Sequence, residues 1–395
     1  MRKFLYKILL FSTLSVFFSE ISLAQPHADD HNTTPTSPNT HVATEAHKNG
    51  DSEHKTEKIN AKNIIFEHIL DAYSFHFFDL GGKTYGIDLP VVLYSKAKGL
   101  EVFSSAKFHH GHETYNGYRL IDEHFVEANK TKFPKIAAGQ LVAIDAAGMP
   151  TNSDFYDLSL TRNMVQMFLA LAILAFILIG VASKYKKGIG VTSAPKGFFQ
   201  NAFETIIIFV RDDVAKANIG KGYQKYVPFL LTIFFFILIN NIFGLIPGTA
   251  NVTGNIAVTA VLGIITFIVV MASTNKHFWG HIFWPPVPHA VKPILVPVEF
   301  LGIFTKHVSL IVRLFANMVA GHVIIISLIS LIFIFKQIST GVGIGSIVVA
   351  LPFTVFIYVV EVLVAFLQAF IFSTLAAVFI SQSREGHDND HAVAH

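Results

Sequence analysis

The second half of the chain ends in two apolar runs that are each longer than a lipid bilayer is thick. A continuous helix over residues 297–335 would be about 58 Å long, and one over residues 346–380 about 52 Å long. The hydrocarbon core of a bilayer is about 30 Å thick, and an average helix tilt of about 20° does not absorb the difference. Each run therefore either breaks into pieces or lies strongly tilted. Because only Gly341–Gly345 separates the runs, we expect an antiparallel hairpin.

Three shorter apolar stretches precede this hairpin, at residues 164–182, 227–246 and 256–272, and each is long enough for one crossing of a membrane. The chain is only 14% charged, against about 25% in average soluble domains. It has no Cys, which excludes disulfides and thiolate metal sites. The net charge of +3 is too small to indicate binding to nucleic acid.

The distribution of charge predicts the orientation of these segments. The loop at residues 184–225 carries eight Lys and Arg against three acidic residues, whereas the loop at 248–253 carries no charge. By the positive-inside rule the first loop is cytoplasmic, so the N-terminus lies outside and the tail at 383–395 lies in the cytoplasm. Within the cytoplasmic loop, Phe198–Val214 has an apolar stripe ended by Arg211 and Asp212, which predicts a helix lying on the membrane surface.

The first 60 residues are predicted to address the chain rather than to fold. Residues 1–24 resemble a secretory signal peptide, with basic residues first, then an apolar stretch, then small residues at Ser22–Ala24. The alternative is a membrane anchor, but Glu20 interrupts the apolar stretch well before bilayer length. Residues 25–60 are polar and rich in His, Asp and Asn, so we expect a disordered linker, although its His residues are a possible loose metal site.

Residues 61–158 have the pattern of a small soluble α+β domain outside the membrane, to which the sequence assigns no function. A helix is expected at Ile64–Tyr73, and strands at Gly86–Tyr94 and Gln140–Ile144. The run His109–Glu113 resembles a metal cluster, but no further ligand is identifiable, so a surface loop is the favoured interpretation. The expected fold class is thus an all-α polytopic membrane protein with five spanning helices, a long tilted hairpin at its end, a cytoplasmic surface helix and this N-terminal domain.

Ionisable residues inside the long runs are costly and are candidates for function by default. In an antiparallel hairpin centred near residue 342, opposite residues have numbers that add to about 683. His322 is then level with Glu361, and Arg313 lies within one turn of Gln368. His322 lies half a turn away from Arg313, which favours two separate polar paths over one. The candidate residues are Arg313, Glu361, His322, Glu299, Asn317 and Gln368.

Each candidate also has a purely structural interpretation. His322 is a possible hydrogen-bonded packing residue, and Asn317 and Gln368 are possible contacts between helices. Glu361 is a possible neutral structural group. Arg313 is harder to explain in this way, because a guanidinium stays charged under essentially all conditions and needs an anionic partner.

Several ordered motifs resemble one family, subunit a of the rotary F-type ATP synthase. The resemblance covers residues 160–382 and is carried by Ser309–His322, Leu367–Phe372, Asn241–Pro247, Asn251–Thr259, and Pro195–Gln200 with Glu204. It implies a non-catalytic stator subunit of the Fo sector in a bacterial inner membrane, without a cofactor or a metal. The implied partners are the c-subunit ring, the b-subunit peripheral stalk, the other synthase subunits and membrane lipid. The N-terminal domain would be periplasmic.

The resemblance implies a role for each candidate residue. Arg313 matches the arginine that faces the carboxylate of the ring, and Asn317 and Gln368 match polar residues that flank it. Glu299 matches an acid of the cytoplasmic half-channel, and Glu361 with His322 matches the pair that lines the outer half-channel. Proton flow through these half-channels would turn the ring and drive ATP synthesis. The resemblance leaves open whether the ion is a proton or sodium.

This sequence departs from the family pattern at a few positions. Many members place an acid at position 322 and a histidine at 361, and here the two are exchanged. Ala316 stands where many members have glycine, and Gly244 stands where some have aspartate. The main alternative function is a polytopic secondary ion transporter, which predicts an internal repeat that the sequence does not show. A voltage sensor needs several regularly spaced arginines, and an anchored N-terminal domain does not need five helices with buried ionisable groups.

Overall fold

The structure is a computed structural model, and it describes residues 72–384 apart from gaps at 81–82, 112, 130–131, 134–135, 137, 146–147, 152–154, 189–196 and 247–248. Several predictions lie wholly or mostly outside the described residues: the signal peptide at 1–24, the linker at 25–60, the helix at 64–73, and the tail beyond Arg384.

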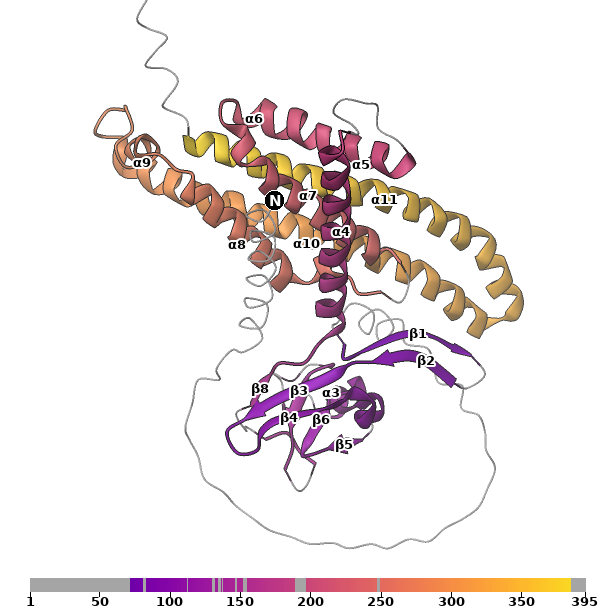
Figure 1. Cartoon of the computed structure of the whole chain (residues 1–395). Helices are drawn as coiled ribbons and strands as arrows, with labels where there is room; N and C mark the ends of the chain where they lie inside the picture. Colours follow the sequence, from indigo (N-terminus) through magenta and orange to yellow (C-terminus); the bar gives the residue numbers. More distant parts are fainter. Residues whose placement is uncertain are drawn as a thin grey trace, which may run out of the picture.

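A bundle of apolar helices forms the larger part of the molecule (Figure 1). Four of its helices are long and apolar enough to cross a membrane: α4 (Arg162–Lys186), α7 (Val227–Gly244), α10 (Lys292–Ile338) and α11 (Thr340–Arg384). A fifth crossing is possible if α8 (Ile256–Ala272) and α9 (Lys276–Phe283), which are bent by 101° at a short break, form one span. The structure therefore has four to five candidate spans.

The helices begin where the sequence offers capping residues. The Thr161 side chain accepts a hydrogen bond from the backbone N–H of Met164 at the start of α4, and Asn255 caps α8 by accepting from Ala257. Pro228 stands in the first turn of α7, where the missing N–H costs nothing. These caps set the ends of the apolar segments.

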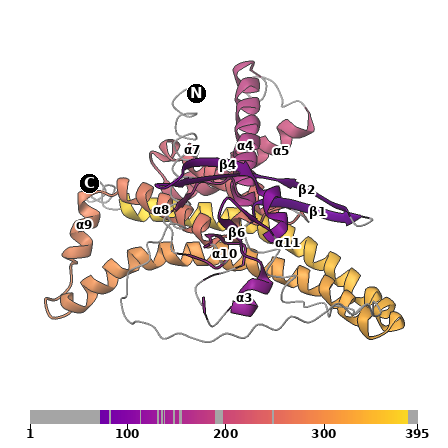
Figure 2. The same ribbon diagram turned by 90° about the horizontal axis from the view of Figure 1, so that it is seen from below.

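The predicted hairpin forms, but its helices are longer than expected and neither breaks. Helix α10 has 47 residues and α11 has 45, so they are about 70 Å and about 68 Å long. Both continue through an internal proline, Pro297 and Pro352 respectively. Figures 1 and 2 show the two helices side by side, crossing α4 at a steep angle.

The turn of the hairpin differs from the sequence prediction. Only Ser339, in an extended conformation, separates the two helices, and the Gly341–Gly345 segment belongs to α11. Of the three glycines, Gly343 serves close packing, because a Cβ built on it would lie 2.8 Å from the Cα of Lys336, whereas Gly345 has open space around it. The prediction of a turn over Gly341–Gly345 was wrong, because a cluster of glycines is found both in turns and where helices pack closely.

The core lies where α4, α7, α8, α10 and α11 meet, and α7 is at its centre. Phe234, Phe235 and Phe236 on α7 are almost fully buried. In contrast, only 17% of the most apolar window of α11 is buried, although its composition is as apolar as that of α10. The two long helices therefore carry an apolar face that the described residues do not cover.

The predicted surface helix packs on protein. Helix α5 (Phe198–Phe209) continues without a break into a π-helical segment, η2 (Val210–Lys216), and then into α6 (Ala217–Ile219). Its apolar stripe meets α7 and α11, with ring centroids of Phe203 and Phe235 5.9 Å apart. The helical segment continues past the predicted end at Val214 as far as Ile219, and its buried side continues beyond Arg211 and Asp212 with Val214 and Ala215. The side chains of Arg211 and Asp212 form a hydrogen-bonded pair that lowers the pKa of the Asp212 carboxyl.

The N-terminal region consists of short antiparallel strands, one α-helix and one 3-10 helix within the described residues. A hairpin pairs β1 (Ser74–Leu80) with β2 (Lys83–Asp88), and two three-stranded sheets follow in the orders β4-β3-β8 and β5-β6-β7. The remaining bounds are β3 (Pro90–Ser95), β4 (Gly99–Ser104), η1 (Ser105–Gly111), β5 (Thr114–Tyr115), β6 (Tyr118–Leu120), α3 (Glu123–Asn129), β7 (Leu141–Ala143) and β8 (Phe155–Asp157).

The core of this region contains the fully buried side chains of Val91, Leu93 and Phe108. The predicted strand at Gln140–Ile144 is confirmed by β7, whereas the predicted strand at Gly86–Tyr94 is two strands. Leu89 divides them: its N–H donates to the carbonyl of Tyr73 and to the hydroxyl of Ser105, and its carbonyl accepts from the N–H of Ser105.

Ala72 and Tyr73, at the end of the helix predicted for residues 64–73, are not helical. In the run His109–Glu113, the two end residues pair at 3.7 Å and both are mostly exposed. His112 lies outside the described residues.

Candidate ion-transfer site

Arg313 lies near the middle of α10, outside the stripe of residues that packs into the bundle but next to it. Leu310 and Leu314 are buried, whereas the Arg313 side chain is exposed, as is that of its neighbour Val312. Among the described residues no hydrogen bond or ion pair to Arg313 is found. A permanent cation on an apolar helix face, in a chain of this kind, needs an anionic partner from elsewhere.

Glu361 and Gln368 share the buried face of α11, as their spacing predicts, with exposed fractions of 8% and 5%. Glu361 contacts Gly321 on α10 closely. A Cβ added to Gly321 would overlap the carboxylate of Glu361. The predicted register of the hairpin is therefore confirmed to within one residue, with half-buried His322 next to the contact.

The Gly321–Glu361 contact leads to a first prediction. On the function that the family resemblance implies, Gly321→Ala should cut ATP-driven proton pumping at least about tenfold, because the new methyl group has to displace the Glu361 carboxylate or separate the helices. Gly302→Ala, at an open position of the same helix, is the matched control and should leave pumping unchanged. Normal pumping in Gly321→Ala at normal expression would show that the carboxylate moves aside without consequence.

Arg313 and Gln368 come to the same level of the hairpin but differ in exposure. The register places Arg313 opposite Ala369, the neighbour of Gln368. Gln368 is buried while Arg313 is exposed, and Asn317, one turn further along, is half-buried. The polar groups thus lie at the border between the packed interior and the uncovered apolar face.

Glu299 lies on α10 on the opposite side of Arg313 from Glu361. It precedes Arg313 by 14 residues, or about 21 Å, whereas Gly321, at the level of Glu361, follows Arg313 by about 12 Å. A Glu299 carboxylate oxygen lies 3.9 Å from Nδ1 of His281 on α9. The sequence did not single out His281, which approaches Glu299 only because α9 bends away from α8 by 101°.

A network of amide side chains holds the loop before α8 against the hairpin. Asn251 accepts from the N–H of Gly254 at 3.0 Å and donates to the carbonyl of Met318 at 3.3 Å. Asn241 donates to the carbonyl of Ala365 at 3.3 Å. In the sequence these residues stand out only as parts of motifs, although polar groups in apolar segments are a usable signal.

The same network explains why position 244 has no side chain. A Cβ on Gly244 would lie 3.3 Å from Oδ1 of Asn251, closer than most real contacts. An aspartate at this position, as some members have, would require Asn251 to shift. The glycine at position 244 therefore allows the loop that carries Asn251 to approach α7 closely.

Comparison with known proteins now decides the family. The model of the family described as ATP synthase A chain matches residues 164–381, more than half of the chain.

The chain belongs to this family.

Among its relatives, "ATP synthase subunit a" of Chloroherpeton thalassium is 44% identical over 281 residues, which is 69% of this chain and 80% of the relative. The protein of the same name in Chlorobium phaeobacteroides is 40% identical over 293 residues, 72% of this chain and 81% of the relative. That of Myxococcus xanthus is 39% identical over 250 residues, 60% and 79% of the two chains.

Membership of the ATP synthase A chain family makes this chain a multi-pass membrane protein and a non-catalytic subunit of the Fo sector of the rotary ATP synthase. The function of this subunit is proton transport coupled to ATP synthesis. The alternative interpretation as a secondary ion transporter is therefore dropped. Residues 64–158 match a second family model, described only as a domain of unknown function (DUF8433).

Proposed function

We propose that the chain is the stator channel of the synthase, with two half-channels that lead protons to and from carboxylates on a ring of c subunits. The observation that carries this proposal is the exposed position of Arg313 on the uncovered apolar face of the hairpin. A rotor that slides along this face would bring its carboxylates past the guanidinium one at a time.

The chemistry of the ring requires such a cation. A carboxylate facing lipid has to be protonated, because an unpaired charge in hydrocarbon is too costly. A deprotonated carboxylate is stabilised opposite Arg313 by a charge-assisted hydrogen bond. Since the guanidinium does not release its own proton, it separates the two half-channels while the ring passes.

The positions along α10 support one assignment of the half-channels. Glu361 and His322 would line the outer path, and Glu299 would line the cytoplasmic path with His281 beside it. Asn317 and Gln368 would flank Arg313 between these paths. Each path then contains one carboxylate and one imidazole, side chains that can accept and release a proton.

Cross-linking to the ring tests this function. The chain has no cysteine, so a single Val312→Cys can be cross-linked to a cysteine near the carboxylate of a c subunit in the assembled synthase. We expect a strong cross-link from this position beside Arg313. Phe176→Cys on α4, which is also exposed, is the control and should not react. Cross-linking from α4 and not from the hairpin would contradict the proposal.

The orientation of the chain is part of the same proposal. Residues 1–24 would be a signal peptide, the domain at 61–158 would be periplasmic, and the tail at 383–395 would be cytoplasmic, in a bacterial inner membrane. The positive charges of the 184–225 loop support this orientation. The b-subunit peripheral stalk would hold this subunit against the torque of the ring.

Cysteine labelling in spheroplasts, in which the inner membrane is intact, tests this orientation. Lys96→Cys, in an exposed turn of the N-terminal region, should react with a membrane-impermeant maleimide within minutes. Lys186→Cys, exposed at the end of α4, should react slowly in intact spheroplasts. Permeabilising the membrane should raise its reaction rate at least about tenfold. The opposite pattern would reverse the proposed orientation.

A further inference from the structure

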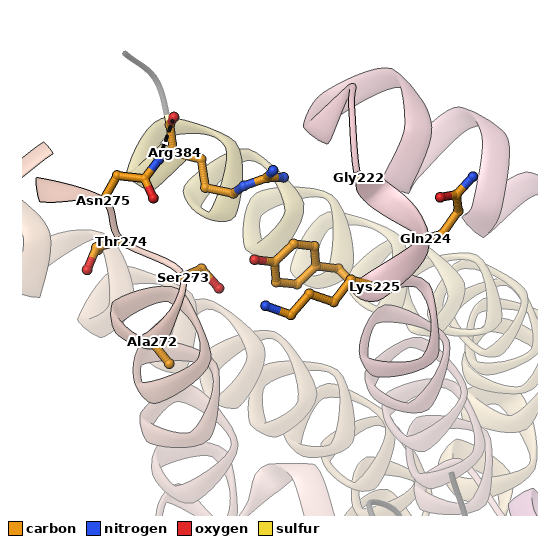
Figure 3. Close-up of a pocket in the computed structure, with 9 residues that line it drawn as sticks. Gly222, Gln224, Lys225, Ala272, Ser273, Thr274, Asn275 and Arg384 are labelled. Atoms are coloured by element: carbon orange, nitrogen blue, oxygen red, sulfur yellow. Dashed lines mark hydrogen bonds between the residues drawn. The ribbon is translucent and has the colours of Figure 1, made fainter. Parts of the chain in front are cut away.

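A cavity of about 430 Å³ lies at the end of the bundle where α7 begins and where α8 and α11 end. Figure 3 shows Lys225 and Arg384 extending into it from two different elements, with Ser273 and Asn275 on a third side. No acidic residue lines the cavity among the described residues. The cavity is adjacent to the basic 184–225 loop and is remote in sequence from the residues of the ion-transfer site.

The two cations of the cavity converge on one aromatic ring. The guanidinium carbon of Arg384 lies 5.6 Å from the ring centroid of Tyr226, and Nζ of Lys225 lies 5.4 Å from it. The ring attracts each cation, but bringing two like charges to one ring is unfavourable without an anion. The arrangement therefore leaves a local excess of positive charge directed at the cavity.

The site is built from ordered parts. One guanidinium nitrogen of Arg384 donates to the carbonyl of Lys221 at 3.2 Å, which leaves its other N–H groups available. Asn275 fixes the end of α11, since its side chain donates to the carbonyl of Arg384 at 3.3 Å. The hydroxyl of Ser273 already donates to the carbonyl of Val269. The donors for a ligand thus come from Lys225 and Arg384.

We propose that this cavity binds a phosphate group, that of an anionic membrane phospholipid. Arginine matches the planar geometry of phosphate oxygens, and lysine adds a second point charge. The apolar part of α7 starts at Val227, directly after Lys225, so the cavity lies where a helix enters the bilayer. Basic pockets between membrane helices on the cytoplasmic side suit lipid headgroups. The bound lipid would join the start of α7 to the ends of α8 and α11.

The test uses the full chain in nanodiscs of phosphatidylcholine with increasing phosphatidylglycerol, and native mass spectrometry counts the retained lipids. We expect the wild-type chain to retain one phosphatidylglycerol with a clear preference over phosphatidylcholine. The double variant Lys225→Gln with Arg384→Gln should weaken this retention at least about tenfold. Arg384→Lys keeps the charge and should retain most of the binding. Lys186→Gln is the matched control, a lysine on the same side of the membrane outside the cavity, and should have no effect.

A second arm separates the two sources of phosphate. Inorganic phosphate is added to nanodiscs of pure phosphatidylcholine, and the thermal unfolding midpoint is measured. Stabilisation by inorganic phosphate that the double variant abolishes, without preference for phosphatidylglycerol, would overturn the lipid as the source. Equal retention of phosphatidylglycerol by the wild-type chain and the double variant would overturn the site itself. Both readouts are independent of proton transport.

Discussion

Replacing Arg313 with alanine should abolish proton-driven ATP synthesis in inverted membrane vesicles, with a loss of about 100-fold or more. On the proposed mechanism, a deprotonated ring carboxylate has no stabilising partner at the interface without the guanidinium, so the ring cannot release its proton there. In addition, protons could then pass directly from one proposed half-channel to the other. The vesicles should therefore lose their coupling between proton flow and ATP synthesis. ATP formed after an imposed pH step, together with the passive proton leak, measures both consequences.

Arg313→Lys should fail to restore synthesis, although it keeps the charge. A lysine ammonium is compact and strongly hydrated, and it loses its proton more readily than a guanidinium when water is excluded. Lys336→Ala, which removes an exposed cation near the turn of the same helix, is the control and should leave synthesis intact. Normal synthesis in either Arg313 variant, at normal assembly of the complex, would contradict the proposed role.

The hairpin and its register were predictable because both follow from regular helix geometry. The Gly321–Glu361 contact lies within one residue of the expected level, since few residues separate the helices and little slip can accumulate. The choice between broken and continuous helices was not predictable from length alone. Even the internal Pro297 and Pro352 do not break the helices.

The parts that sequence reasoning missed depend on bends and on contacts between distant segments. His281 reaches Glu299 through the sharp break between α8 and α9, which no periodic pattern indicates. Likewise, Lys225 and Arg384 are far apart in the chain and meet only through the packing of α7 against α11. Periodicity predicts which face of a helix is buried, but not which helix end lies next to which.

The second prediction with a large effect concerns Glu361 and His322, the acid and the imidazole that are exchanged relative to many family members. Glu361→Gln should slow proton entry from the outer side at least about tenfold, because an amide can neither accept nor release the proton. The glutamine has nearly the same size, so the contact with Gly321 should survive and the complex should assemble normally. Proton flux out of the inverted vesicles, whose lumen faces the outer half-channel, is measured at a fixed membrane potential. Glu127→Gln, an exposed acid of the N-terminal region, is the control.

The double variant His322→Glu with Glu361→His tests whether the pair acts as a unit. Position 361 lies against Gly321, next to His322, so the exchange keeps one acid and one imidazole at nearly the same depth of the hairpin. It should recover part of the flux that Glu361→Gln loses, whereas His322→Gln with Glu361→Gln should recover none. Wild-type flux in Glu361→Gln would remove Glu361 from the path. A swapped variant as slow as Glu361→Gln would show that the acid works only from its buried position on α11.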